Sequence, residues 1–535
     1  MRISSKKTLV CALACIAALA AAPSGRTEEA ANPDGSARKA YRPDTPLKNT
    51  EHPAHEKYQA MLDDYMARPD RYTERWRPQF HFSTPQGWMN DPNGLVCFDG
   101  KYRMCFQHRH GTFDGRTSWG NSYSMDLVHW TVLPPAIVAD ELGAVYSGTA
   151  AVDWKDSSGF FDGKPGLLAM FTCNRRHTGQ VQGLAFSRDG GDTWRKYAGN
   201  PVIENYGTPI FIDPKLFWHE PTRRWIAFIG GHGKLRIYSS PNAREWRYES
   251  TIEEIGPGGE VADVFRLPVN NDPNNVKWVW SAVGVWFVVG DFDGHEFTPE
   301  TGRVNFDAGP DAWAAQSWSD MPPEDGRRVF TYWVWEFRHY RRHEAFRNWC
   351  GALTLPRTLS LLQGGDGNYR MAQTPVRELK TLRGKTHSLG PLALKAGETR
   401  PTDIRSNTLE IAAKFEPADT GRFGIRFLKG GGQQTVVGYD AETRRMFMDR
   451  SRSGSGKGKK TESRELLPED GRVRLRVFAD VSIVETFGNG GVANMTGLVL
   501  PEPENDAGEI FAEGAGVRVS RLDLHEMKSI WRARE

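Results

Sequence analysis

A repeating unit runs through the first part of this 535-residue chain. The segments SYSMDLVHW, AFSRDGGDTW and IYSSPNAREW each combine a short apolar run, a serine, a polar turn and a tryptophan. These tryptophans, Trp130, Trp194 and Trp246, are 64 and 52 residues apart. Hairpin units at this spacing are typical of β-propeller blades, and roughly 300 residues would form about five blades of about four strands each. A β-sandwich with coincidental turns is the alternative interpretation.

Alternation of apolar and polar residues replaces this repeat in the last part of the chain. The segments LEIAAKF, FGIRFL, TVVGYD, VRLRVFAD and VSIVETF alternate at period two, which indicates strands with one buried face. Sheets of this kind pack face to face as a β-sandwich. We expect the sandwich to support the first domain, and Glu485 in VSIVETF has no chemical partner that the sequence identifies.

The domain organisation follows from length and from these two patterns. A chain of 535 residues is too long for one ordinary hydrophobic core, so two folded domains are expected. We predict an all-β protein with a five-bladed β-propeller over residues 72–375, a linker over residues 376–405 and a β-sandwich over residues 406–535. Residues 23–71, rich in proline and charge, are predicted to form an N-terminal extension with one short amphipathic helix, HEKYQAMLDDYMA.

The N-terminus has the pattern of a secretory signal peptide. Residues 1–22 combine a basic start, an apolar run and small residues near the end, and the run is shorter than a membrane span. We therefore expect a secreted protein, extracellular or periplasmic, without a membrane span.

Composition limits the partners of the chain. The formal net charge is only +3 and no basic face dominates, so a nucleic-acid partner has no support. The 18 tryptophans and 27 phenylalanines are many, while long helical patterns are few. This combination favours a protein that stacks aromatic side chains on sugar rings.

Four cysteines follow the predicted signal peptide: Cys97, Cys105, Cys173 and Cys350. With Asp99-Gly100 as a hairpin turn, Cys97 faces Tyr102 and Cys105 faces Gly94, so these two thiols are out of register. We expect buried free thiols. No Cys-x-x-Cys pair is present, so no zinc site is expected.

Three acidic residues lie in settings suited to chemistry: Asp91 in WMNDPNG, Asp213 in FIDPKLFW and Glu260 in GGEVADVF. Two or three carboxylates in one cleft are the usual equipment for breaking a glycosidic bond. We expect the Asn-Asp-Pro-Asn-Gly stretch to form a tight turn that aims Asp91 into such a cleft. Spacing alone does not select these three from 66 acidic residues.

Several ordered blocks make the chain resemble glycoside hydrolase family 32, the invertases, levanases and inulinases. HFSTPQGWMNDPNGLV carries the motif WMNDPNG intact, and VYSGTAAVDW is similar to the FSGS block. DPKLFWHEP resembles RDPKVFW, GGEVADVFRLPV resembles WECPDLF, and RLRVFADVSIVETFGNGG resembles the C-terminal sandwich signature. The resemblance implies a five-bladed propeller followed by a β-sandwich, in agreement with the repeat.

The resemblance also implies roles for the three acids. Asp91 matches the nucleophile, Glu260 the general acid/base, and Asp213 the carboxylate that holds sugar hydroxyls and stabilises the transition state. In a retaining mechanism the carboxyls of Asp91 and Glu260 lie about 5–5.5 Å apart. Glu260 would need a raised pKa and Asp91 a low one.

Other positions are implied as substrate contacts, and no metal or organic cofactor is implied. The substrate would be sucrose or a fructan such as levan or inulin. Polar substrate-binding positions are expected at Asn90, Gln107 and Ser147, and walls of the site at Trp88, Trp119 and Trp333. For each tryptophan, packing in the core is the alternative.

The chain departs from the family pattern at three places. Arg-Asp-Pro of the family reads Ile212-Asp213-Pro214 here, Glu-Cys-Pro reads Glu260-Val261-Ala262, and the block Gln-Tyr-Asn-Pro reads QHRH. Isoleucine has neither the charge nor the hydrogen-bond donors of arginine. Alternatives to fructose release are therefore hydrolysis of another furanoside such as an arabinofuranoside, fructosyl transfer, or sugar binding without catalysis.

Overall fold

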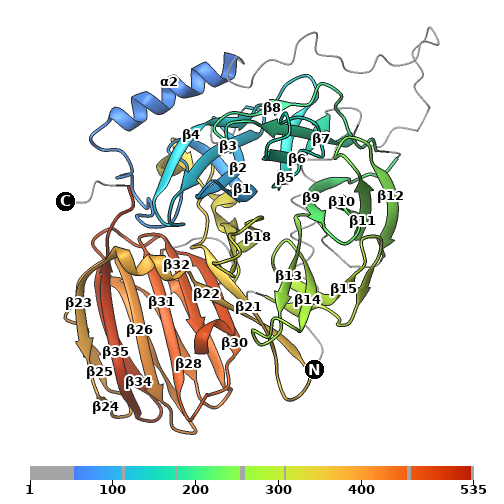
Figure 1. Ribbon diagram of the computed structural model, residues 1–535. Helices are drawn as coiled ribbons and strands as arrows, with labels where there is room; N and C mark the ends of the chain where they lie inside the picture. The colour runs from blue at the N-terminus through green and yellow to red at the C-terminus, as the bar shows by residue number, and fades with distance from the viewer. Residues whose placement is uncertain are drawn as a thin grey trace, which may run out of the picture.

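The computed structural model describes residues 53–531, apart from 111–114, 176–178, 206, 254–258, 307–308 and 455–459. The predicted signal peptide and most of the predicted extension lie outside the described residues. The expected amphipathic helix is present as α2 (Pro53–Ala67). Tyr58 on α2 is buried, with its ring 5.1 Å from that of His108, so the helix lies against the first sheet (Figure 1).

The described part of the chain is all-β, and residues 87–375 form five small sheets, antiparallel except for the parallel pairing of β1 with β20. The first sheet contains β1 (Gly87–Phe98), β2 (Lys101–Arg109), β3 (Ser118–Ser124), β4 (Trp130–Ile137) and β20 (Trp349–Cys350), and the second contains β5 (Ala144–Asp153), β6 (Gly166–Arg175), β7 (Gly179–Ser187) and β8 (Arg195–Lys196). The third contains β9 (Ile212–His219), β10 (Arg224–Gly231), β11 (Lys234–Ser240) and β12 (Arg247–Ile252), and the fourth contains β13 (Ala262–Pro268), β14 (Val276–Ala282), β15 (Trp286–Phe292), β16 (Phe297–Pro299) and β17 (Val304–Asn305). The fifth contains β18 (Ala312–Ser317), β19 (Arg328–Val334), β21 (Arg357–Gln363) and β22 (Tyr369–Pro375).

Hydrogen bonds join the first strand of each sheet to the first strand of the next, and the last sheet to the first. Figure 1 shows the five sheets following one another around a common centre. Five hydrogen bonds link β1, β5, β9, β13 and β18 or the residues beside them. In each, a backbone N–H donates to a residue of the neighbouring strand: Gly148 to Asn93, Leu216 to Thr149, Val261 to Asp213, Ser317 to Asp263, and Ser319 to Leu95. These five strands are therefore held next to one another although they come from distant parts of the sequence.

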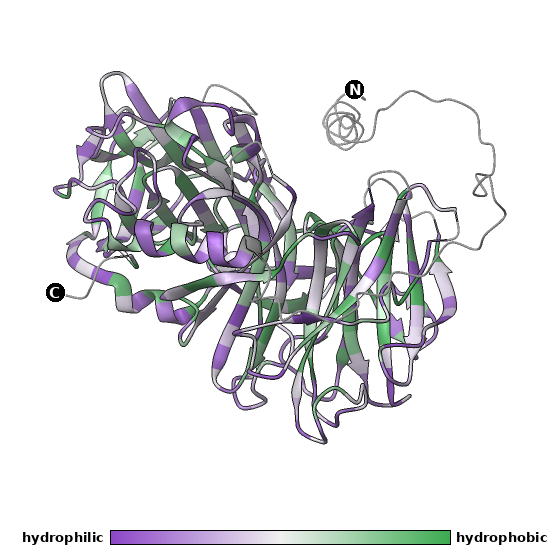
Figure 2. Cartoon of the chain, turned by 90° about the horizontal axis from the view of Figure 1, so that it is seen from above, coloured by the Kyte–Doolittle hydropathy of each residue, from purple (hydrophilic) through white to green (hydrophobic). Residues whose placement is uncertain are grey.

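Two larger sheets follow and share one hydrophobic core. One contains β23 (Arg383–Leu389), β24 (Leu392–Leu394), β26 (Thr408–Glu416), β31 (Val473–Asp480), β32 (Ile483–Gly488), β33 (Ala493–Leu498) and β35 (Val517–Met527); the other contains β25 (Thr399–Pro401), β27 (Arg422–Gly430), β28 (Gln433–Asp440), β29 (Arg445–Arg452), β30 (Thr461–Glu465) and β34 (Ala507–Glu513). Short 3-10 helices are η2 (Trp335–His339), η3 (Glu344–Phe346), η4 (Arg377–Leu382) and η5 (Asn489–Gly491). Figure 2 shows hydrophobic positions concentrated along the strands and hydrophilic ones on surface loops.

The segment 376–405, expected to be a linker, contains η4 and three strands. β23 and β24 pair with β35, and β25 pairs with β34, so this segment belongs to the larger sheets. These strands lie at sheet edges, where many side chains are exposed and the apolar alternation is weak. No helix among the described residues is long and apolar enough to cross a membrane.

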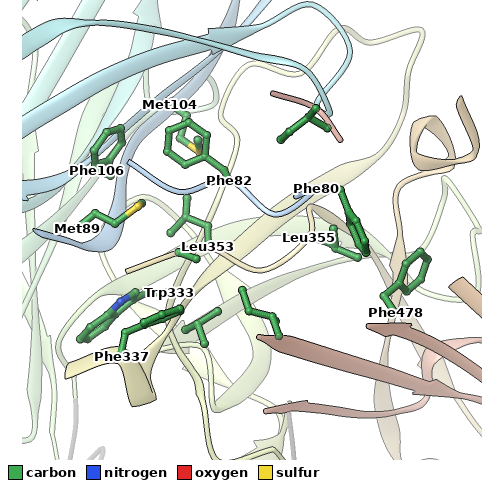
Figure 3. Packing of buried hydrophobic residues seen from close by; sticks show 14 of the residues in the cluster. Phe80, Phe82, Met89, Met104, Phe106, Trp333, Phe337, Leu353, Leu355 and Phe478 are labelled. Carbon is green, nitrogen blue, oxygen red and sulfur yellow. The ribbon is translucent and has the colours of Figure 1, made fainter. Parts of the chain in front are cut away.

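A hydrophobic cluster connects the small sheets to the larger ones. It includes Phe82 and Met104 near the first sheet and Phe478 on β31, all of them buried (Figure 3). All four expected free cysteines are present and buried, as predicted. The hairpin register is as expected for Cys97, which lies opposite Tyr102.

Glu485 is one centre of a buried ionic network beside this cluster. Its Oε1 accepts hydrogen bonds from the backbone N–H of Leu355 (2.7 Å) and lies 2.9 Å from Nε2 of His81. Its Oε2 accepts two bonds from the Arg357 guanidinium, at 2.8 and 3.1 Å. The other ring nitrogen of His81 lies 2.8 Å from Asp480 Oδ2. Glu485 and Asp480 thus connect the larger sheets to residues 81 and 355–357.

The His81 contacts predict a pH-dependent stability. Burial lowers the pKa of His81, but hydrogen bonds to Asp480 and Glu485 outweigh burial and raise the pKa to about 9. Because a pKa raised above the ordinary 6.5 favours the folded state when histidine is protonated, this contribution is complete below about pH 6.5 and is lost as pH rises through 9. We expect a loss of about 3 kcal/mol of unfolding free energy, measured by denaturant unfolding between pH 6 and 10.

The matched variant is His81→Gln, which keeps a polar side chain without a titrating charge. Its stability should already be reduced at pH 6, by about 3–5 kcal/mol because two buried carboxylates lose a cation. The fall between pH 6 and 10 should also be smaller than in the wild type. Equal pH dependence in both proteins would contradict the assignment.

Candidate active site

Asp91 lies inside β1, in an irregular part of the strand. The pairing of β1 with β2 shifts register between Met89 and Pro92 and again between Asn93 and Val96. The expected tight turn is therefore wrong: the motif forms β-bulges within a strand, which bend it and re-aim its side chains. Asp91 and its neighbour Asn90 are partly buried.

The three predicted polar substrate-binding residues gather around the Asp91 carboxylate. Ser147 on β5 donates from Oγ to Asp91 Oδ2 over 2.7 Å, and the Asn90 amide donates to Oδ1 over 3.1 Å. Gln107 on β2 donates to Ser147 Oγ over 2.5 Å and lies 3.4 Å from Asp91 Oδ2. The carboxylate is thus oriented by side chains from two sheets.

Asp213 lies at the start of β9 with a strained backbone. Its φ is 60°, a left-handed conformation that is uncommon for residues other than glycine. Its backbone N–H donates to Thr172 Oγ1 over 2.8 Å, and its carboxylate Oδ2 accepts from the Val261 N–H over 3.1 Å. The side chain is buried. Thr172 is a supporting residue that the sequence did not single out, and Val261 was noted there only as a departure from the family pattern.

Glu260 lies two residues before β13, beside that Val261 N–H. Val261 has a φ of 46°, which is a clear outlier for a β-branched residue. Gly230 on β10 makes the close approach possible, because a Cβ at this position would collide with the carbonyl oxygen of Gly259. The segment holding Glu260 is therefore packed closely on β10, and glycine is required at position 230.

Asp213 is electrostatically coupled to both of the other acids. Burial, followed by the charges of Asp91 and Glu260, raises the pKa of Asp213 well above its usual range. Burial raises the pKa of Glu260, as expected for an acid, although a backbone hydrogen bond and His232 oppose it. Burial also raises the pKa of Asp91, against the hydrogen bonds from Ser147 and Asn90. The low pKa expected for Asp91 is therefore wrong, because burial outweighs the donors.

The predicted tryptophans divide into two kinds. Trp88 and Trp333 pack edge to face at 5.6 Å, and Trp88 Nε1 donates to Asn90 Oδ1 over 2.8 Å, so this pair adjoins the Asp91 network. Trp119 is fully buried, donates to the Tyr146 carbonyl and contacts Phe171 in a hydrophobic core. Trp119 is thus a core residue, for which the alternative interpretation holds.

Two further tryptophans, Trp335 and Trp313, follow Trp88 and Trp333 to form a row of four aromatic rings. The ring centroids of Trp333 and Trp335 are 5.0 Å apart, and those of Trp335 and Trp313 are 4.9 Å apart. Trp313 packs beside Val261, next to Glu260. The sequence signal was the aromatic content of DAWAAQSW and WVWEF, which does not distinguish a site wall from a core.

Two of the departures from the family pattern, Ile212 and Val261, adjoin Asp213, while Arg109 lies on β2. Ile212 is partly buried and pairs with Gly230 across the β9–β10 ladder. The guanidinium of Arg109 donates to Thr117 Oγ1 over 3.0 Å and interacts electrostatically with Tyr146, which in turn interacts with Asp213. Tyr146 thus lies under the influence of both Arg109 and Asp213, whereas residue 212 itself is apolar.

An all-β fold that brings three carboxyl groups and an aromatic row together has the equipment of a glycoside hydrolase. Two family models match the chain: "Glycosyl hydrolases family 32 N-terminal domain" over residues 81–375 and "Glycosyl hydrolases family 32 C terminal" over residues 378–526. The chain belongs to glycoside hydrolase family 32, and it is a glycoside hydrolase.

Relatives and solved structures agree with this membership. The chain is 38% identical to a levanase of Bacillus subtilis (strain 168), over 86% of this chain and 72% of the levanase. It is 35% identical to a levanase of Bacillus sp. (strain L7), over 87% of this chain and 53% of that protein. The crystal structure of exo-inulinase from Aspergillus awamori superposes with a TM-score of 0.77 at 28% identity, over 86% of this chain and all of that one.

Proposed function

We propose that this protein is a retaining hydrolase that releases fructose from sucrose or from fructans such as levan and inulin. The observation that carries the proposal is the hydrogen bond from the Val261 N–H, beside Glu260, to Asp213 Oδ2, together with the pKa of Asp213, which the charges of Asp91 and Glu260 help to raise. Similarity to proteins named levanase and exo-inulinase supports fructans as the substrate class.

We further propose that the five small sheets are the blades of a five-bladed propeller and that the two larger sheets form a β-sandwich. The closed sequence of hydrogen bonds between β1, β5, β9, β13 and β18 supports this arrangement. In such a propeller the starts of the inner strands converge on one pocket. We also propose that the protein is secreted, since one relative is named an extracellular exo-inulinase.

The proposed reaction has two displacements. Asp91 attacks the anomeric carbon of a terminal fructosyl unit, while Glu260 gives its proton to the departing glycosidic oxygen. Glu260 then takes a proton from water, whose oxygen attacks the same carbon and releases Asp91. This scheme needs the two carboxyls about 5–5.5 Å apart. Asp213 holds sugar hydroxyls, and Asn90 and Gln107 complete the polar side of the pocket.

The test is incubation of the purified protein with sucrose, inulin, levan and an arabinan, followed by identification of the released sugar. We expect fructose from at least one of the first three and no arabinose. Release of arabinose alone, or of no sugar from any substrate, would reject the proposal. Formation of longer fructosyl products at the expense of free fructose would assign the chain to transfer instead.

Residue 212 offers a test of specificity. Ile212→Arg should place a guanidinium beside Asp213 and change the ratio of kcat/KM values for sucrose and levan on the order of tenfold, about 1.4 kcal/mol. The reason is that a cation with several donors binds hydroxyls that isoleucine leaves unpaired. Ile212→Leu, which keeps an apolar side chain of the same size, is the control. An unchanged ratio in the arginine variant would place residue 212 outside the sugar subsite.

A further inference from the structure

A buried ion pair joins β9 and β13, close in sequence to two of the proposed catalytic acids. Lys215 Nζ is 2.7 Å from Asp263 Oδ1, and the two side chains are only 3% and 2% exposed. Lys215 follows Asp213 by two residues on β9, and Asp263 follows Glu260 by three residues on β13. The pair therefore joins the strand of one acid to the strand of the other.

Asp263 is also connected to the next inner strand. Its Oδ2 accepts a hydrogen bond from the Ser317 N–H on β18 over 2.8 Å. Arg328 interacts electrostatically with Asp263 and with Asp320, and Lys215 also interacts with Asp320. Two cations and two carboxylates thus balance each other in this cluster. Lys215 consequently has a partner for its charge other than the three carboxyls of the site.

The backbone beside this pair needs to be held in place. Asp213 and Val261 both have positive φ values, of 60° and 46°, and such conformations persist only where the surroundings fix them. The Val261 N–H, in this conformation, donates to Asp213 Oδ2. The ion pair is a second connection between the same two segments, within three residues of both acids.

We propose that Lys215 and Asp263 are positioning residues of the hydrolase, which set the separation between Asp213 and Glu260 without touching the sugar. This inference rests on the proposed function. A displacement of about 1 Å of a catalytic group costs on the order of 100-fold in rate, so a modest loosening of β9 against β13 has a measurable effect.

The experiment must separate positioning from stability. Removing one member of a buried ion pair leaves an unpaired charge and destabilises the fold, whereas replacing both members by apolar residues is often close to neutral. The informative protein is the double variant Lys215→Met with Asp263→Asn, which removes both charges and keeps an acceptor for the Ser317 N–H, compared with Lys215→Met and Asp263→Asn alone. Each is assayed for thermal unfolding, kcat, KM and the pH profile of kcat/KM on sucrose or levan, whichever the wild type cleaves.

We expect the double variant to melt close to the wild type but to lose about 10- to 100-fold in kcat with KM changed far less. Its pH profile should move to lower pH, because carboxyl groups that are less tightly held together repel each other less. Lys196→Met is the matched control: Lys196 Nζ is 2.9 Å from Asp140 Oδ2, on the edge strand β8. It should keep the wild-type kcat.

Two outcomes would overturn the proposal. A double variant with wild-type kcat and pH profile would show that the pair contributes only stability, and a double variant that does not fold would show that the pair is required for folding itself. If the wild-type protein releases no fructose, the proposed function itself is rejected. The wild-type assay is done first, so this result is distinguished from a failure of the positioning proposal.

Discussion

Asp91→Asn is expected to abolish fructose release, with a fall in kcat of about 10⁴-fold, the scale seen when a single member of a catalytic unit is removed. An amide has nearly the same shape as a carboxylate, but it has no negative charge with which to attack the anomeric carbon. The donors around residue 91, the Ser147 hydroxyl and the Asn90 amide, are arranged for an acceptor. The measurement is kcat on levan and sucrose with the variant at concentrations high enough to detect residual turnover.

A surface aspartate provides the control. Asp162 pairs with Arg188 at an exposed position, so Asp162→Asn removes the same charge away from the pocket and should leave kcat unchanged. Substrate binding by the Asp91 variant should persist, because the proposed contacts from Gln107 and Asp213 remain. A kcat above about one tenth of the wild-type value would be incompatible with covalent attack by Asp91, because removal of a catalytic nucleophile lowers kcat far more than tenfold.

Local residue chemistry predicted those parts of the fold that depend on neighbours in sequence. The turn between β1 and β2 has φ values of 50° at Asp99 and 69° at Gly100, as a two-residue hairpin with an Asp-Gly turn requires. The same hairpin places Cys97 opposite Tyr102. Cys105, in contrast, lies opposite Asn93 and not Gly94, because the bulges of β1 shift the register. A bulge adds a residue to one strand without any distinctive composition, so alternation cannot reveal it.

Local sequence patterns did not predict contacts between segments that are distant in the sequence. The partners of Glu485 lie 128 or more residues away in sequence, and its burial shows only once the larger sheets pack on residues 81 and 357. Trp88 and Trp119 are both buried aromatic residues on strands, and the sequence does not show that Trp88 hydrogen-bonds Asn90 beside Asp91 while Trp119 packs against Phe171. The three acids themselves were found through the resemblance, since their convergence depends on closure of the sheets.

Glu260→Gln is expected to lower kcat by about 10²–10⁴-fold, the range that a positioned general acid contributes. Burial raises the pKa of Glu260, so the wild-type carboxyl stays protonated to higher pH than an ordinary glutamic acid. The basic limb of the wild-type pH profile should report the loss of this proton. Glutamine cannot titrate, so this limb should disappear in the variant.

The leaving group decides whether Glu260 acts as the acid. A fructoside of an acidic phenol departs without a proton, so with this substrate the variant should form the covalent intermediate nearly as fast as the wild type. A burst of phenol followed by slow turnover is expected, because Glu260 is also needed to deprotonate water. Glu296→Gln, at an exposed position before β16, serves as the control and should be fully active. Equal losses with sucrose and with the activated fructoside would mean that residue 260 supports the pocket and does not transfer the proton.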